Sequence, residues 1–81
     1  MNIMNKEEFL EAFRAEFEDT DPHEIVLQTE FRNLEDWSSI VGMGLIVMAQ
    51  ERYGVQMSPT DLRGCKTVEE VYNFISANSK Q

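Results

Sequence analysis

Residues 37–54 read Trp-Ser-Ser-Ile-Val-Gly-Met-Gly-Leu-Ile-Val-Met-Ala-Gln-Glu-Arg-Tyr-Gly, and they predict the central helix of the protein. Two serines come before a long apolar run, and serine is favoured at the N-cap of a helix. Gly54 follows the run, where glycine accepts the left-handed backbone conformation that ends many helices. We therefore predict a helix that begins at Ser38 or Ser39 and covers residues 39–53.

The apolar run within this helix is too short to cross a membrane. It extends from Ile40 to Ala49, about half of the ~20 residues that a membrane-spanning helix needs. Residues 1–5 lack the basic flank and apolar run of a signal peptide. Cys65 is the only cysteine, which excludes an intramolecular disulfide and suits a reducing compartment. These features predict a cytoplasmic protein without a membrane span.

The segment before the central helix also has helical periodicity. Asn5 stands in a capping position with Glu8 three residues later, which is typical of a helix N-terminus. Phenylalanines at four-residue spacing then share one helix face, namely Phe9, Phe13 and Phe17. Proline disfavours the helical conformation of the residue before it, so the helix must end before Asp21-Pro22. We predict a helix over residues 5–19.

Two more helices follow the central one. Ser58 and Asp61 form a capping pattern around a proline at the first helical position, which predicts a short helix over residues 59–63. Thr67 and Glu70 form a second capping box, which predicts a helix over residues 67–77. The apolar side chains of this last helix recur at helical spacing, at Val68, Val71, Tyr72 and Ile75.

Residues 20–38 lack a regular pattern. No second strand-like segment exists to pair with residues 25–27, so we predict a long loop. Its apolar side chains are expected to cover the open side of a helical core: Ile25, Leu27, Phe31, Leu34 and Trp37. The predicted fold is an all-α four-helix bundle, a single domain over residues 1–81, with a short third helix and a long first loop. Loops this long usually carry function.

The charge and the size of the chain exclude several classes of function. Its 81 residues include 15 acidic and 7 basic side chains, a net charge of −8. Nucleic-acid binding needs a basic surface, so no nucleic acid is expected, and partners with basic surfaces are favoured. So small a domain leaves little room for a catalytic cleft beside its core. We therefore expect a monomeric protein that is not an enzyme.

The acidic loop and two reactive side chains give weak signals for a site. Three carboxylates stand at the first, third and twelfth positions of an EF-hand-like calcium loop: Asp19, Asp21 and Glu30. However, Glu24 occupies the position where the sharp turn needs glycine. His23 has no neighbouring nucleophile to serve, and Cys65 has only Lys66 to lower its pKa. A solvated acidic loop, a surface histidine and a packing cysteine are the preferred interpretations, with no metal site.

The serine pair carries the strongest functional signal. One serine suffices to cap the helix over residues 39–53. A hydroxyl at a helix N-terminus is also well placed to carry a phosphate ester, because unpaired amide groups and the positive end of the helix dipole favour an anion. Ser38 and Ser39 both remain candidates on this argument.

Several segments in register resemble the acyl carrier protein family, small acidic four-helix bundles that carry a 4′-phosphopantetheine arm on one serine. The resemblance covers about residues 28–77. Its segments are Thr29-Glu30-Phe31-Arg32-Asn33-Leu34, Ser38-Ser39-Ile40, and the stretches over residues 47–55, 58–62 and 66–72. Counting back from Tyr53 places Ser39 at the attachment position, with Ser38 as the second choice in the place of the family's usual aspartate.

The resemblance implies how the protein would carry acyl groups. A phosphopantetheinyl transferase would move the arm from coenzyme A to Ser39. The thiol of the arm would then carry acyl groups as thioesters to acyl-loading, condensing and acyl-transfer enzymes of fatty-acid, polyketide or related lipid synthesis. Three alternatives remain open: an aminoacyl or peptidyl carrier on the same scaffold, an unmodified protein-interaction bundle, and a calcium sensor.

The helix over residues 39–53 departs from the family in its charge. Family members usually carry several acidic residues there, whereas the first one here is Glu51. Exposed apolar patches often mark interaction sites. We predict a partner-docking stripe at Val41, Leu45 and Met48, with a charged margin at Glu35, Asp36 and Glu51. The core would contain Phe31, Ile40, Met43, Ile46, Val47, Met57, Val68, Val71 and Tyr72. Gly42 and Gly44 would make the helix pliable or allow a partner to approach closely.

Overall fold

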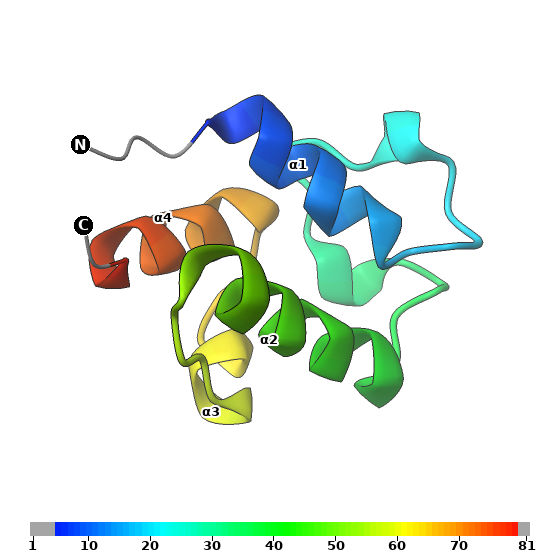
Figure 1. The fold of residues 1–81 in the computed structure, drawn as a ribbon. Helices are drawn as coiled ribbons and strands as arrows, with labels where there is room; N and C mark the ends of the chain where they lie inside the picture. Colours follow the sequence, from blue (N-terminus) through cyan, green and yellow to red (C-terminus); the bar gives the residue numbers. More distant parts are fainter. Residues whose placement is uncertain (1–4, 80–81) are drawn as a thin grey trace.

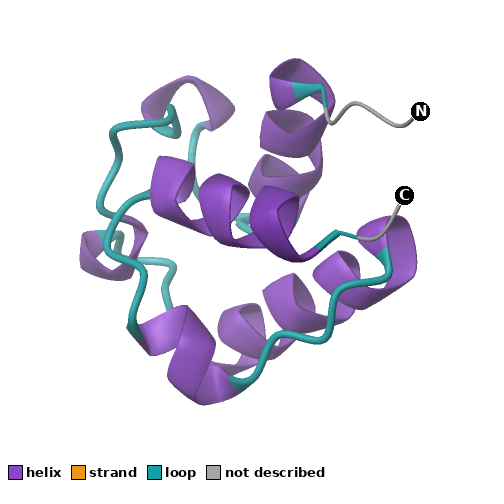
Figure 2. Ribbon diagram, turned by 90° about the vertical axis from the view of Figure 1, so that its left-hand side faces the viewer, coloured by secondary structure: helices purple, strands orange, loops and turns teal. Residues whose placement is uncertain are grey.

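Helix α2 (Ser39–Tyr53) is the longest element of the fold, which we describe from a computed structural model over residues 5–79. The other helices are α1 (Lys6–Ala15), α3 (Pro59–Arg63) and α4 (Val68–Asn78), and two 3₁₀ turns, η1 (Pro22–Glu24) and η2 (Phe31–Asn33), lie between α1 and α2. No strand occurs within residues 5–79, which confirms the predicted all-α class (Figures 1 and 2). The predicted domain over residues 1–81 also includes residues 1–4 and 80–81, which lie outside this range.

Helix α2 begins at a serine N-cap and ends at a glycine C-cap, as its sequence predicts. Ser38 is extended, and its Oγ accepts a hydrogen bond from the backbone amide of Val41 at 3.2 Å. At the other end Gly54 has φ +68°, and its amide donates to the carbonyls of Ala49 and Gln50. The helix therefore spans the predicted residues, between a serine cap and a left-handed glycine.

Helix α1 ends at Ala15, earlier than the predicted residue 19. Its last turn tightens, because the amides of Glu16 and Phe17 donate to carbonyls three residues back, at 3.1 and 3.0 Å. The amide of Asp19 donates to the carboxylate of Asp36 at 2.8 Å instead of to a carbonyl of α1. A contact with the distant loop thus replaces the hydrogen bond that a longer helix would need.

Helix α3 begins at the predicted capping box, whereas α4 forms only one half of the capping box predicted for it. The Ser58 hydroxyl accepts from the Asp61 amide at 3.1 Å, and the Asp61 carboxylate accepts from the Ser58 amide at 3.0 Å. The Thr67 hydroxyl accepts from the Glu70 amide at 3.2 Å, but the Glu70 carboxylate accepts from the amide of Lys66 and not from that of Thr67. Helix α4 starts at Val68, one residue later than predicted. In the bundle, α3 lies against α2 and α4 lies against α1 (Figure 1).

The long segment between α1 and α2 contributes to the core, as predicted. Ile25 and Phe31 are buried, and three further side chains pack against the core from partly buried positions: Leu27, Leu34 and Trp37. The ring of Phe31 lies 5.5 Å from that of Phe13 and 5.4 Å from that of Trp37, between ring centroids. These aromatic contacts attach the loop to α1 and position the residues just before α2.

The face that α2 turns to the core differs from the predicted one. Leu45 and Met48 are only 1% and 5% exposed, and Val41 is half-buried. Three residues predicted for the core are exposed instead: Ile40 at 83%, Met43 at 55% and Val47 at 47%. Of the remaining predicted core residues, Phe31, Met57, Val68 and Val71 are buried, whereas Ile46 and Tyr72 are partly buried.

The physical reason lies in the composition of α2. Its first ten residues after Ser39 carry no charged side chain, so hydrophobic periodicity does not distinguish one face from another. The buried face contains the small residues Gly42 and Ala49, which allow neighbours to come close. A Cβ at Gly42 would lie 3.1 Å from the ring of Trp37, and one at Gly44 would collide with the carboxylate of Glu16. Gly42 therefore allows close packing against Trp37, whereas the Glu16 carboxylate beside Gly44 is the end of a flexible side chain that can shift.

None of the helices in the described part of the chain is long and apolar enough to cross a lipid bilayer.

Candidate functional site

The two serines at the start of α2 have different environments. The hydroxyl of Ser38 is engaged as the helix cap. Ser39 is the first helical residue, its side chain is exposed, and its hydroxyl makes no hydrogen bond within residues 5–79. The serine that the resemblance selects is thus the one whose hydroxyl is accessible and not occupied by the fold.

The backbone around Ser39 favours a negatively charged group. Helix α2 has 15 residues, and its peptide dipoles place partial positive charge at its N-terminus. No acidic residue occurs in the first turn of this helix. A phosphate ester on Ser39 would therefore lie at the electropositive end of the helix.

A groove between α2 and α3 is lined by Ser39 among other residues. Its volume is about 290 Å³. Its apolar walls come from both helices and from the loop before α2: Trp37, Met43, Ile46, Pro59 and Leu62. Gly42 forms part of its floor, where a Cβ would meet both Trp37 and Leu62. The groove offers a largely apolar surface to any chain attached at Ser39.

Two arginines complete the lining of this groove, and sequence reasoning did not single them out. Arg32 lies in η2, and Arg63 is the last residue of α3. Arg32 Nη1 donates to the carbonyl oxygens of Leu62 at 3.1 Å and Cys65 at 2.6 Å, which ties η2 to the end of α3. No local motif contains both arginines, because only the tertiary fold brings η2 and α3 together.

These residues fit a phosphate ester that carries an extended arm. The Ser39 hydroxyl has no hydrogen-bond partner among the described residues and would serve as the attachment point, the arginines supply positive charge, and the groove supplies apolar contact. Among the described residues no histidine or carboxylate lines the groove, so this lining contains no general base to activate the hydroxyl. An external enzyme would have to supply that chemistry.

Two of the three residues predicted for the docking stripe are buried, and the third, Val41, is half-buried. Leu45 and Met48 are buried in the core, and their place on the surface is taken by Ile40, Met43 and Val47. These three residues recur at a spacing of three and four, so they share one face of α2, which begins beside Ser39. Of the predicted charged margin, Glu35 and Glu51 are exposed, whereas Asp36 binds the amide of Asp19 and the hydroxyl of Thr20.

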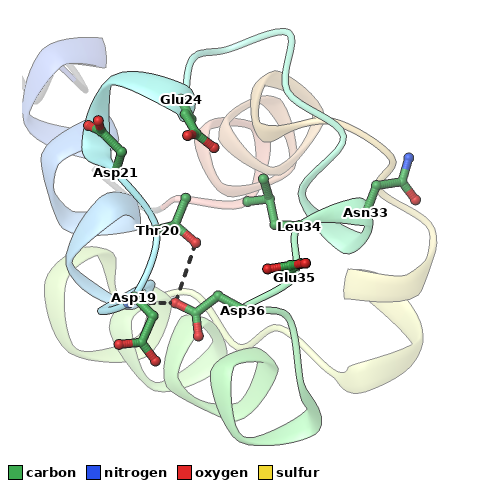
Figure 3. Close-up of a pocket in the computed structure, with 8 residues that line it drawn as sticks. All are labelled: Asp19, Thr20, Asp21, Glu24, Asn33, Leu34, Glu35 and Asp36. Carbon is green, nitrogen blue, oxygen red and sulfur yellow. Dashed lines mark hydrogen bonds between the residues drawn. The ribbon is translucent and has the colours of Figure 1, made fainter.

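The acidic loop forms a separate cavity of about 560 Å³, shown in Figure 3. Its carboxylates are those of Asp19, Asp21, Glu24, Glu35 and Asp36. Glu30, the twelfth residue of the EF-hand-like pattern, does not line it. No group of three or more histidine, cysteine or acidic side chains within residues 5–79 is arranged to hold a metal ion. The calcium pattern in the sequence is therefore not assembled in space.

His23 and Cys65 lie where the preferred interpretations placed them. His23 is exposed, and its amide donates to the carboxylate of Asp21, which lowers the pKa of that carboxyl group. Cys65 is buried, and burial raises the pKa of its thiol. A buried thiol with a raised pKa is a poor nucleophile, in agreement with a packing role.

Comparisons with known proteins identify the family of the chain. Residues 7–75 match the family described as "Phosphopantetheine attachment site". The chain is similar to an acyl carrier protein of Thermosynechococcus vestitus, with 30% identity over 76 residues, which cover 90% of this chain and 94% of that protein. The chain therefore belongs to the acyl carrier protein family, whose members are carriers with a covalently attached 4′-phosphopantetheine group and not enzymes.

Proposed function

We propose that this protein carries acyl groups on a 4′-phosphopantetheine arm attached to Ser39, and that it serves fatty-acid, polyketide or related lipid synthesis. One observation supports the choice of serine above all others. The Ser38 hydroxyl accepts a hydrogen bond from the amide of Val41, whereas Ser39 is exposed, lines the groove, and has no hydrogen-bond partner for its hydroxyl within residues 5–79. The arm, once attached, supplies a terminal thiol that holds the acyl group.

The protein's own residues position the attachment atom and leave the catalysis to a transferase. The transferase would form a phosphodiester at the Oγ of Ser39 and release the nucleotide half of coenzyme A. Helix α2 holds this oxygen at its electropositive end, where the new phosphodiester charge is favoured. The described lining of the groove contains no general base, which is consistent with catalysis by the transferase.

Partner enzymes are proposed to contact the apolar face of α2 formed by Ile40, Met43 and Val47. Their exposure supports this assignment, because large apolar side chains gathered on one helix face tend to mark interaction sites. Glu35 and Glu51 are exposed and would form a charged margin toward basic partner surfaces. We propose a monomeric cytoplasmic carrier, for which a single buried cysteine is suitable.

Intact-mass measurement after incubation with coenzyme A and a broad-specificity phosphopantetheinyl transferase tests the proposal. We expect one phosphopantetheine addition to the wild-type protein and none to Ser39→Ala. Ser38→Ala is the matched control, because it removes a neighbouring hydroxyl and the cap but leaves the attachment oxygen. It is expected to be modified.

Two results would contradict the assignment. Modification of Ser39→Ala together with loss of modification in Ser38→Ala would move the site to Ser38. A folded wild-type protein that no transferase modifies would instead favour an unmodified interaction bundle.

A further inference from the structure

The groove beside Ser39 has an unexpected charge for so acidic a chain. Two of its 7 basic side chains, Arg32 and Arg63, line this one groove. Within residues 5–79 neither guanidinium forms an ion pair with a carboxylate. Two permanent positive charges are therefore left without a neutralising partner next to the attachment serine.

The hydrogen bonds of both arginines hold them in place without cancelling their charge. Arg32 donates through Nη1 to two backbone carbonyls, and Arg63 donates through Nη2 to the hydroxyl of Thr60 at 3.3 Å. A guanidinium has five N–H donors, so each arginine keeps donors for a further acceptor. A phosphate group is the acceptor that this planar donor set fits best.

We propose that, in the protein loaded at Ser39, this groove holds the 4′-phosphopantetheine arm against the protein, with Arg63 and Arg32 binding its phosphodiester. The proposal rests on the proposed function, and it assigns to the arm a bound position in place of free motion in solvent. The phosphodiester carries one negative charge and is tethered at the serine that lines the groove. Tethering makes the contact intramolecular, so even a weak interaction is populated.

The rest of the groove suits the remainder of the arm. Trp37, Met43 and Leu62 offer apolar surface to its alkyl parts. The volume of about 290 Å³ lies just below the range for small-molecule pockets, roughly 300–1,000 Å³, so the groove accommodates part of the arm. Met43 belongs both to this groove and to the exposed face of α2, so a docking partner would contact the edge of the occupied groove.

Trp37 gives a direct readout, because it is the only tryptophan and it lines the groove. Acrylamide quenching of its fluorescence is measured before and after loading at Ser39, and the phosphodiester is followed by phosphorus NMR. Loading is expected to protect Trp37 in the wild-type protein. Arg63→Gln is expected to lower the equilibrium constant for binding of the arm in the groove about two- to fivefold, as for loss of an exposed charge pair. Trp37 in this loaded variant should therefore be less protected from acrylamide than in the loaded wild-type protein.

Arg52→Gln is the matched control. It removes the same charge, but Arg52 lies in the last turn of α2 and lines a different cavity. It is expected to leave the protection of Trp37 as in the wild-type protein. Added salt gives a second test without any variant, because screening should expose Trp37 in the loaded protein and not in the unloaded one.

Each failure has a distinct meaning. Equal quenching of Trp37 before and after a loading that mass spectrometry places on Ser39 would overturn the groove proposal and leave the carrier function intact. An equal effect of Arg52→Gln and Arg63→Gln would overturn the role of the groove arginines. A protein that takes up no arm would overturn the proposed function together with this inference.

Discussion

Leu45 and Met43 stand two positions apart on α2 and have opposite environments. Leu45 is 1% exposed and belongs to the core, whereas Met43 is 55% exposed and lies on the proposed docking face. Both are large apolar side chains within an apolar run, so their identities alone do not tell which one faces the solvent. The choice of the buried face depends on Gly42 and Ala49, which lie on the same side of α2 as Leu45. Their small size lets other side chains of the core pack closely against that side.

Alanine at each of these two positions tests the assignment of the faces. Leu45→Ala is expected to lower the free energy of unfolding by ~2–5 kcal/mol, because it leaves a cavity in the core. Met43→Ala is expected to change it by less than about 0.5 kcal/mol, as for most surface substitutions. Urea denaturation followed by circular dichroism measures both. Equal losses would show that the two faces of α2 are wrongly assigned.

At the scale of the element, features that depend on a few neighbouring residues were predictable. The serine cap of α2, its terminal glycine, the capping box of α3 and the threonine cap of α4 each involve residues at most five positions apart. The end of α1 was not predictable in this way, because it depends on the contact between Asp19 and the distant Asp36. The arginine-lined groove was missed for the same reason, since Arg32 meets the end of α3 only in the folded chain.

The end of α2 offers a test of the local rule. Gly54 has φ +68°, a conformation that costs a residue with a Cβ about 1–2 kcal/mol, although no atom blocks the space. Gly54→Ala is therefore expected to lower the free energy of unfolding by about 1 kcal/mol or slightly more. Gly64→Ala is the control, because Gly64 is right-handed at φ −76° and there alanine is expected to be neutral or stabilising. Thermal or urea unfolding compares the two, and a cost for Gly64→Ala equal to that for Gly54→Ala would refute a conformational origin.

At the scale of the whole molecule, charge and apolar surface are separated. The net charge is −8, and five carboxylates line the loop cavity of Figure 3. The exposed face of α2 beside Ser39 is apolar from Ile40 to Val47. Long-range attraction raises the rate of encounter with a basic partner, whereas desolvated apolar contacts govern how long the complex lasts. The two surfaces therefore have separable kinetic effects.

Kinetics of loading by a phosphopantetheinyl transferase with a basic surface would separate these effects. Increasing salt is expected to lower the association rate constant of the unloaded protein, because screening weakens steering by the net charge of −8. Met43→Gln removes apolar contact without changing charge, and it is expected to raise the dissociation rate constant about fivefold, as for a contact worth ~1 kcal/mol. Val26→Gln is the matched control, since Val26 is also an exposed apolar residue, at 41%, but belongs to the loop. Stopped-flow measurements give both rate constants. Two results would contradict these assignments. If Val26→Gln raised the dissociation rate constant as much as Met43→Gln, the effect would not be specific to the apolar face of α2. If salt changed only the dissociation rate constant, the net charge would not steer association.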